Sequence, residues 1–167
     1  MPSKKTLLYD RKNQTLTKGF KKGGEWGRRR REKSIGLDRY EREKCIYKRK
    51  LDYIPQMISF DNEKREIIIE IKGKSLYDKY PLHHRRKFIP QIKELYKRFK
   101  DDTGLFHNDI RFQNILEENG KLYLIDFEYC GLYFTDTEKL AGRGDCVPFY
   151  TRDIYEAVGD FTNKQES

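Results

Sequence analysis

The sequence lacks several features that would place it in a special class of protein. It contains no run of 18 apolar residues, and its first residues do not form the apolar segment of a signal peptide, so neither a membrane helix nor secretion is indicated. Its three cysteines are odd in number and include no Cys-x-x-Cys pair, which argues against a disulfide framework or a zinc site. We expect a cytoplasmic protein with reduced cysteines and no membrane contact.

Apolar and acidic residues are also scarce. Of the 167 residues, 36% are hydrophobic and 38% are charged, so a single domain with a small, aromatic-rich core is expected. Lys and Arg outnumber Asp and Glu by 36 to 27, which gives a formal net charge of +9. Such a charge attracts phosphate groups and acidic proteins. The basic run 28–31 is therefore a candidate contact with nucleic acid or an acidic protein, although it could also be a simple solvated segment.

The most informative segment spans residues 107–128. Asp109 is followed five residues later by Asn114, and Asp126 comes directly after a short apolar run. Phosphoryl transfer from ATP needs an acid that orients the accepting hydroxyl and oxygen ligands that hold Mg²⁺. The Asn-Gly pair at 119–120 predicts a tight turn, so a hairpin would hold Asn114 and Asp126 side by side. Each residue alone could be an ordinary turn residue, but together they predict a magnesium site.

This segment resembles the catalytic loop and metal-binding segment of the protein-kinase-like superfamily, which includes Ser/Thr kinases, small Rio-like kinases and choline and aminoglycoside kinases. His-Asn-Asp at 107–109 and Ile-Asp-Phe-Glu-Tyr at 125–129 are most similar to choline kinases. Arg111, in contrast, stands where Ser/Thr protein kinases carry a lysine that contacts the transferred phosphate. The resemblance implies two catalytic residues and two metal ligands: Asp109 and Arg111, and Asn114 and Asp126.

The resemblance also implies a lysine that contacts the nucleotide phosphates. Two β-prone runs, 6–9 and 15–18, predict a hairpin that ends at Lys18. Lys18 is therefore the candidate, with the lysines at 21–22 as rivals in a lysine-rich chain.

A helix is predicted over 37–51, because its apolar residues recur at helical spacing. The resemblance makes Glu43 in this helix the ion-pair partner of Lys18. Glu41 is the second choice, and a solvated glutamate is the alternative interpretation of Glu43.

A second hairpin is predicted from 54–60 and 66–71, followed by a hinge. The resemblance implies that backbone groups around Glu70 to Lys72 bind the adenine edge of ATP. Apolar residues at helical spacing then predict an amphipathic core helix over 85–100.

Two features depart from the superfamily pattern. A Gly-x-Gly-x-x-Gly motif is absent between the first strands, so the loop that covers the phosphates in relatives is expected to be missing. Residues 129–167 leave little room for the helical substrate pocket that choline kinases add after the metal-binding segment. Size therefore favours a macromolecular acceptor.

These observations predict an α+β fold of the minimal two-lobed kinase type. The single domain would span 1–167, with a reduced N-terminal sheet lobe at 1–71, a hinge at 72–74 and a truncated helical lobe at 75–167. The first-choice function is an ATP- and Mg²⁺-dependent atypical Ser/Thr protein kinase with a protein substrate. The alternatives are a small-molecule kinase of the choline or aminoglycoside type and a non-catalytic kinase-like binding module.

Overall fold

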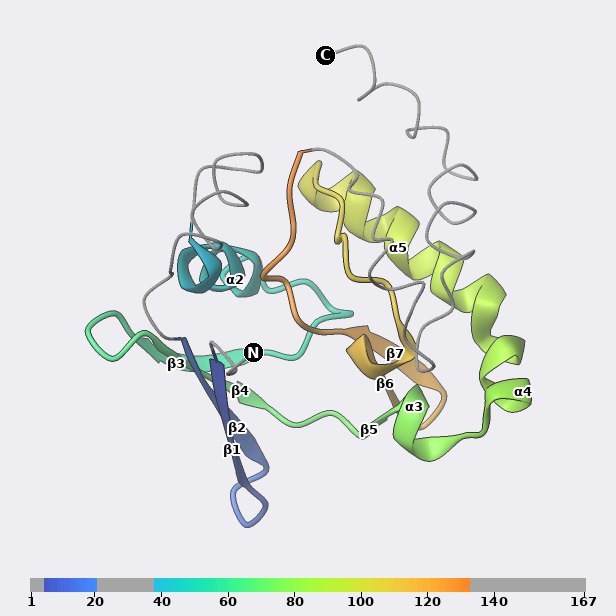
Figure 1. Cartoon of the computed structure of the whole chain (residues 1–167), viewed down its shortest axis with the longest axis horizontal. Coiled ribbons are helices and arrows are strands. Elements are labelled where there is room, and N and C mark those ends of the chain that lie inside the picture. The colour runs from blue at the N-terminus through green and yellow to red at the C-terminus, as the bar shows by residue number, and fades with distance from the viewer. Residues whose placement is uncertain (1–4, 21–37, 133–167) are drawn as a thin grey trace.

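The computed structural model describes residues 5–20 and 38–132, which form two antiparallel sheets with helices packed around them (Figure 1). One sheet has four strands in the order β1-β2-β4-β3, and the other has three in the order β5-β6-β7. The predicted α+β fold is confirmed. The basic run 28–31 and everything after residue 132 lie outside the described residues, so the expected contact with nucleic acid or acidic protein stays a prediction.

The elements follow the predicted order along the chain. Both hairpins of the first sheet, the β6–β7 hairpin and the long core helix are confirmed, although β5 is not predicted by the sequence. The strands are β1 (Lys5–Asp10), β2 (Thr15–Phe20), β3 (Met57–Asp61), β4 (Glu66–Glu70), β5 (Lys74–Ser75), β6 (Ile115–Glu118) and β7 (Lys121–Leu124). The helices are α2 (Arg39–Tyr47), α3 (Leu76–Lys79), α4 (Leu82–Arg85) and α5 (Ile89–Thr103), with 3-10 turns at Arg86–Phe88 and Phe112–Asn114.

Strand β2 lies inside the first sheet and carries Lys18 on the face turned toward α2. Lys18 pairs in register with Ile67 of β4, and both side chains are buried. Two residues further on, the Phe20 ring packs edge-on against Tyr40 of α2 with ring centroids 5.9 Å apart. Because side chains alternate along a strand, this packing directs the Lys18 ammonium group into the space beneath the sheet.

Helix α2 is shorter than the predicted range 37–51. Asp38 caps its N-terminus by accepting a hydrogen bond from the backbone N–H of Glu41 at 2.9 Å. The helix ends at Tyr47, and Lys50 then adopts a left-handed backbone with φ 54°, which turns the chain toward the next strand. The helix buries charged as well as apolar side chains, including Arg42 and Glu43, so apolar spacing alone overstates its length.

Residues 71–73 connect the two sheets and lead into β5. Gly73 has a φ of +65°, and a Cβ atom there would lie 2.1 Å from the carbonyl oxygen of Glu117. Any larger residue would therefore clash with the backbone of β6. Lys74, the last residue of the predicted hinge, already belongs to β5 and pairs with Glu117.

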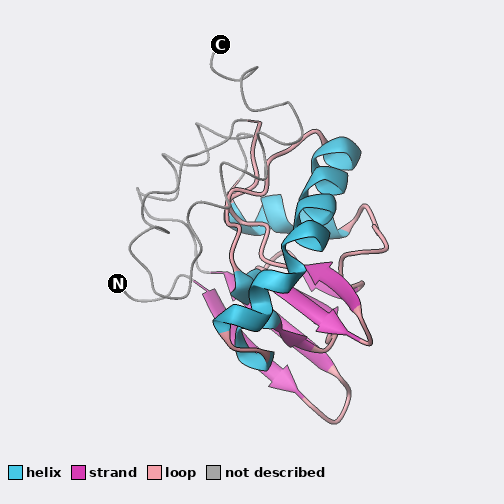
Figure 2. Cartoon of the chain, turned by 90° about the vertical axis from the view of Figure 1, so that its right-hand side faces the viewer, coloured by secondary structure: helices cyan, strands magenta, loops and turns pink. Residues whose placement is uncertain are grey.

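The β6–β7 hairpin packs against the long helix α5 (Figure 2). Asn119 and Gly120 both have positive φ, 52° and 85°, as a two-residue type I′ turn requires. Helix α5 buries its apolar stripe and is capped at its C-terminus by Gly104, which has a φ of 73°. The stripe consists of Ile92, Leu95, Tyr96 and Phe99.

None of the described helices is both long and apolar enough to cross a membrane.

Candidate active site

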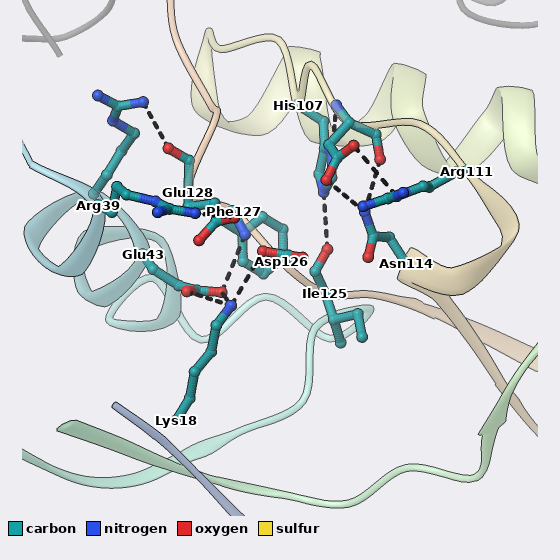
Figure 3. A network of polar contacts seen from close by, with 12 residues as sticks. Lys18, Arg39, Glu43, His107, Arg111, Asn114, Ile125, Asp126, Phe127 and Glu128 are labelled. Carbon is teal, nitrogen blue, oxygen red and sulfur yellow. Dashed lines mark hydrogen bonds and ion pairs between the residues drawn. The ribbon is translucent and has the colours of Figure 1, made fainter. Parts of the chain in front are cut away.

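Five of the residues that the sequence singles out converge from both sheets and from α2 (Figure 3). Lys18 comes from β2, Glu43 from α2, and the remaining residues from the loop before β6 and the segment after β7. All of them are less than 9% exposed. They are Lys18, Glu43, Asp109, Asn114 and Asp126.

The Lys18 ammonium group lies between two carboxylates. Its Nζ is 2.7 Å from Oε2 of Glu43 and 3.1 Å from Oδ1 of Asp126. Burial disfavours the charge on Lys18, but the carboxylates of Asp126 and Glu43 hold its pKa well above the ordinary value. The predicted Lys18–Glu43 ion pair is therefore formed, whereas Glu41 pairs with Lys44 at 3.2 Å.

Asp109 is held in place by the side chain of Asn114. Asn114 Nδ2 donates to Oδ2 and to the carbonyl oxygen of Asp109, both at 2.9 Å. Burial and the nearby Asp126 carboxylate raise the pKa of Asp109 to about 6, against the opposing effect of Arg111. Asp109 is thus a stronger base than an ordinary aspartate and is still mostly ionised at neutral pH.

His107 supports Asp109 from behind. Its Nδ1 accepts a hydrogen bond from the backbone N–H of Asp109 at 3.2 Å, and its Nε2 lies 2.9 Å from the carbonyl oxygen of Ile125. This pair of contacts requires the neutral imidazole with its proton on Nε2. Burial lowers the pKa of His107 to about 4. The ring therefore joins the catalytic loop to the segment that carries Asp126 without carrying a charge.

Asn114 and Asp126 lie next to each other, as the hairpin predicts. The backbone N–H of Ile125 donates to the carbonyl oxygen of Asn114 at 3.1 Å. Since Nδ2 of Asn114 is directed at Asp109, its Oδ1 is the atom left to act as a metal ligand. One amide oxygen and one carboxylate suit Mg²⁺, which takes one or two protein carboxylates together with phosphate oxygens. The donor set fits the predicted ion.

Arg111 lies beside the carboxylate of Asp109. Its Nε is 3.5 Å from Oδ1 of Asp109, and its side chain is 18% exposed. This position places a permanent cation next to the point where a hydroxyl group would be activated. The arrangement agrees with the predicted phosphate contact of Arg111, and that role stays a prediction.

The structure reduces the number of backbone N–H groups between Glu70 and Lys72 that could bind the adenine, as follows from their hydrogen bonds. The N–H groups of Glu70 and Ile71 donate to the carbonyl oxygens of Gln56 and Gln14, at 3.0 and 2.9 Å. These two donors are used within the first sheet, so a backbone donor for the base would have to come from Lys72. The Lys72 side chain lies 3.6 Å from a Glu70 carboxylate oxygen.

Comparison with known proteins agrees with this geometry. A family model for choline/ethanolamine kinases matches residues 30–139, which is more than half of the chain. The chain belongs to the choline/ethanolamine kinase family. A search of curated proteins gave no match.

Membership of the choline/ethanolamine kinase family supports a phosphotransferase of the kinase type, and it favours a small-molecule acceptor. The Ser/Thr protein kinase that the sequence suggested first is not confirmed. The matched range includes Glu43, Asp109, Asn114 and Asp126 but begins after β2. The assignment of Lys18 therefore depends on its contacts in the structure.

Sequence reasoning missed several residues of this kinase-family site. Arg39 and Arg42 of α2 reach Glu128, and His107 connects two loops. The positions 39, 42 and 43 share one face of a helix, which could have shown that α2 directs a charged face to the site. In a chain with 36 Lys and Arg residues, that signal is hard to separate from a solvated surface.

Proposed function

We propose that this chain transfers the γ-phosphoryl group of ATP to the hydroxyl group of a small molecule, with Mg²⁺ as the metal ion. One observation carries the proposal: Lys18 and Glu43 meet the Asp109, Asn114 and Asp126 set in a single buried site. The family match supports the same reaction class. Magnesium, when bound, would neutralise negative charge on the phosphate groups.

Each side chain has a role that follows from its position. Asp109 would orient the accepting hydroxyl and take its proton, because its raised pKa makes it a better base. Asn114 Oδ1 and the Asp126 carboxylate would hold the metal ion. Lys18, fixed by Glu43, would contact the phosphates, and Arg111 would stabilise the charge on the transferred group.

The family match suggests the class of acceptor, a small amine alcohol. Choline and ethanolamine are the first acceptors to test. The experiment incubates the full chain with ATP, Mg²⁺ and each amine alcohol, and detects the phosphorylated product by phosphorus NMR. An acidic protein with accessible Ser and Thr residues is included to test the protein kinase alternative.

The variant Asp109→Asn separates this reaction from other ATP-dependent reactions. We expect product formation to fall by about 10²-fold to 10⁴-fold, the usual contribution of a general base, while ATP still binds. The control is Asp101→Asn, because Asp101 makes an exposed ion pair with Lys97 and should leave turnover unchanged. Equal rates for Asp109→Asn and wild type would refute the proposed chemistry. Phosphorylation of the protein alone would favour the Ser/Thr kinase alternative.

A binding module without catalysis makes a different prediction. In that case Asp126→Ala would not change ATP consumption, because neither protein would consume ATP. We expect wild type to consume ATP with Mg²⁺ present and Asp126→Ala to lose this activity, since Asp126 supplies the carboxylate ligand.

A further inference from the structure

Helix α2 contacts the metal-binding segment through three neighbouring side chains. Glu43 Oε1 accepts a hydrogen bond from the backbone N–H of Phe127 at 3.1 Å. Arg42 Nη1 donates to the carbonyl oxygen of Glu128 at 2.6 Å, and Arg39 Nη2 lies 2.6 Å from the Glu128 carboxylate. One face of α2 therefore binds the two residues that follow Asp126.

These contacts are largely buried, so removal of one partner is costly. Arg42 and Glu128 are each 2% exposed, and Glu43 is fully buried. The Arg39 side chain is 12% exposed. Removing one partner of a buried charged pair lowers the stability far more than the same change at the surface. The geometry also places the Arg39 guanidinium over the ring of Tyr129, 5.7 Å from its centroid.

Asp126 needs such support because its backbone is strained. It has a φ of 68°, a left-handed conformation that residues other than glycine rarely adopt. The residue before it is fixed by the hydrogen bond from Ile125 N–H to Asn114, and the residue after it by Glu43. The Phe127 ring is fully buried against Tyr47 of α2, with centroids 5.4 Å apart.

We propose that Arg39, Arg42 and Glu128 form a clamp between α2 and the metal-binding segment, and that this clamp positions Asp126 as a metal ligand. The same helix carries Glu43, which holds Lys18. The clamp thereby joins the phosphate-contacting lysine and the metal ligand into one rigid unit before a nucleotide arrives. Glu128 gives the segment a charged side chain that Arg39 can hold in place.

The clamp predicts that Arg39 is a positioning residue that acts through Glu128. In Arg39→Gln the Glu128 carboxylate loses its 2.6 Å ion pair with Arg39, so the segment should open more often. We expect faster hydrogen exchange of the Phe127 amide in the nucleotide-free protein. We also expect weaker binding of a non-hydrolysable ATP analogue in the presence of Mg²⁺, by about 10-fold to 100-fold, as for other residues that orient a metal ligand. Arg39→Lys keeps the charge and should restore part of both properties.

The matched control is Arg65→Gln. Arg65 Nη1 makes a 2.7 Å ion pair with Asp38, and the Arg65 side chain is 16% exposed, so the two arginines are similar in contact length and in burial. The Asp38 side chain is 22% exposed, against 3% for Glu128. Arg65 reaches the N-cap of α2 instead of Glu128. We expect Arg65→Gln to lower the stability of α2 while Phe127 protection and Mg²⁺-dependent analogue binding stay closer to wild type.

The outcomes separate the clamp from the proposed function. Wild-type protection of Phe127 in Arg39→Gln, or an equal loss in Arg65→Gln, would overturn the clamp. Lost protection with unchanged analogue affinity would overturn its role in positioning Asp126. That role rests on the proposed function, which would fail if wild type bound no analogue with Mg²⁺. The hydrogen-exchange comparison would then still decide whether the clamp exists.

Discussion

The two halves of the candidate active site are held by different kinds of contact. In the catalytic loop, neutral side-chain amides donate to backbone carbonyl oxygens at most 21 positions away, as Asn108 does to Tyr129 and Asn114 to Asp109. In the lysine half, charged groups meet across 25 to 108 positions, as Lys18 does with Glu43 and Asp126. The first half is organised by its local sequence, and the second exists only when the two sheets and α2 are assembled.

The difference in charge predicts a difference in sensitivity. A neutral hydrogen bond contributes about 1 kcal/mol net, whereas removal of one partner from a buried ion pair costs about 3 to 5 kcal/mol. The lysine half should therefore respond more strongly to substitution than the loop half.

The largest effect is expected for Lys18→Met. This change removes the Lys18 ammonium group from between the buried carboxylates of Glu43 and Asp126, so the free energy of unfolding should fall by about 3 kcal/mol or more near neutral pH. Burial already raises the pKa of Glu43. Protonation of Glu43 should thus reduce the loss as the pH falls. Urea unfolding of wild type and variant at several pH values measures both effects.

The control for this prediction is Lys97→Met. Lys97 pairs with Asp101 at 2.8 Å, but both side chains are about half exposed, and an exposed pair of this spacing contributes about 0.3 to 0.5 kcal/mol. Similar losses in both variants would show that the lysine half is not specially dependent on charge.

A second prediction concerns Gly73, in the segment that connects the two sheets. Gly73→Ala places a methyl group against the backbone of Glu117, at 2.1 Å before any relaxation, and at a φ of +65°. We expect the free energy of unfolding to fall by about 3 kcal/mol, because clash and backbone strain add. Gly104→Ala is the control, since its φ is +73° but no atom lies within 4 Å. It should lose about 1 kcal/mol, and a comparable loss in both variants would contradict the close approach.

A third prediction tests whether the loop half is held by an uncharged group. The pKa of His107 is about 4 in the folded protein and about 6.5 in an unfolded chain. The unfolded state therefore binds the proton more tightly, and stability is lost as the pH falls below about 6.5, with a loss of about 2.5 kcal/mol near pH 4.5. NMR titration of the ring should give a midpoint near the lower value. A midpoint above about 6 would mean that His107 is not the neutral link described.

The contrast between the halves also explains what the sequence could predict. Asp109 and Asn114 precede the β6–β7 hairpin and Asp126 follows it, so turn and strand signals suffice to bring these residues together. Lys18 and Glu43 were found through resemblance to a kinase pattern, which supplies the long-range pairing that periodicity cannot. Their ion pair is now confirmed by the structure.

The contacts that could not be predicted depend on tertiary packing. Arg39 and Arg42 look like surface residues in a basic chain. The burial of Arg42 and the partial burial of Arg39 follow from the position of α2 over residues 127–128. Strand β5 has two residues, too few for a periodic signal. Chain length favours a macromolecular acceptor, whereas the family match favours a small molecule.

The smallest effect on stability is expected in the turn of the β6–β7 hairpin. Gly120→Ala introduces a Cβ at a φ of +85° with no atom within 4 Å, so the cost is backbone strain of about 1 kcal/mol without a clash. At the other end of the hairpin, Asn114 is held by its hydrogen bond to Asp109 and Asp126 by that from Lys18, so we expect ATP affinity to stay at the wild-type level. Urea unfolding and analogue titration test the two parts separately. A loss of affinity larger than the loss of stability would mean that the turn, rather than the contacts near Asp109, sets the geometry of the loop half.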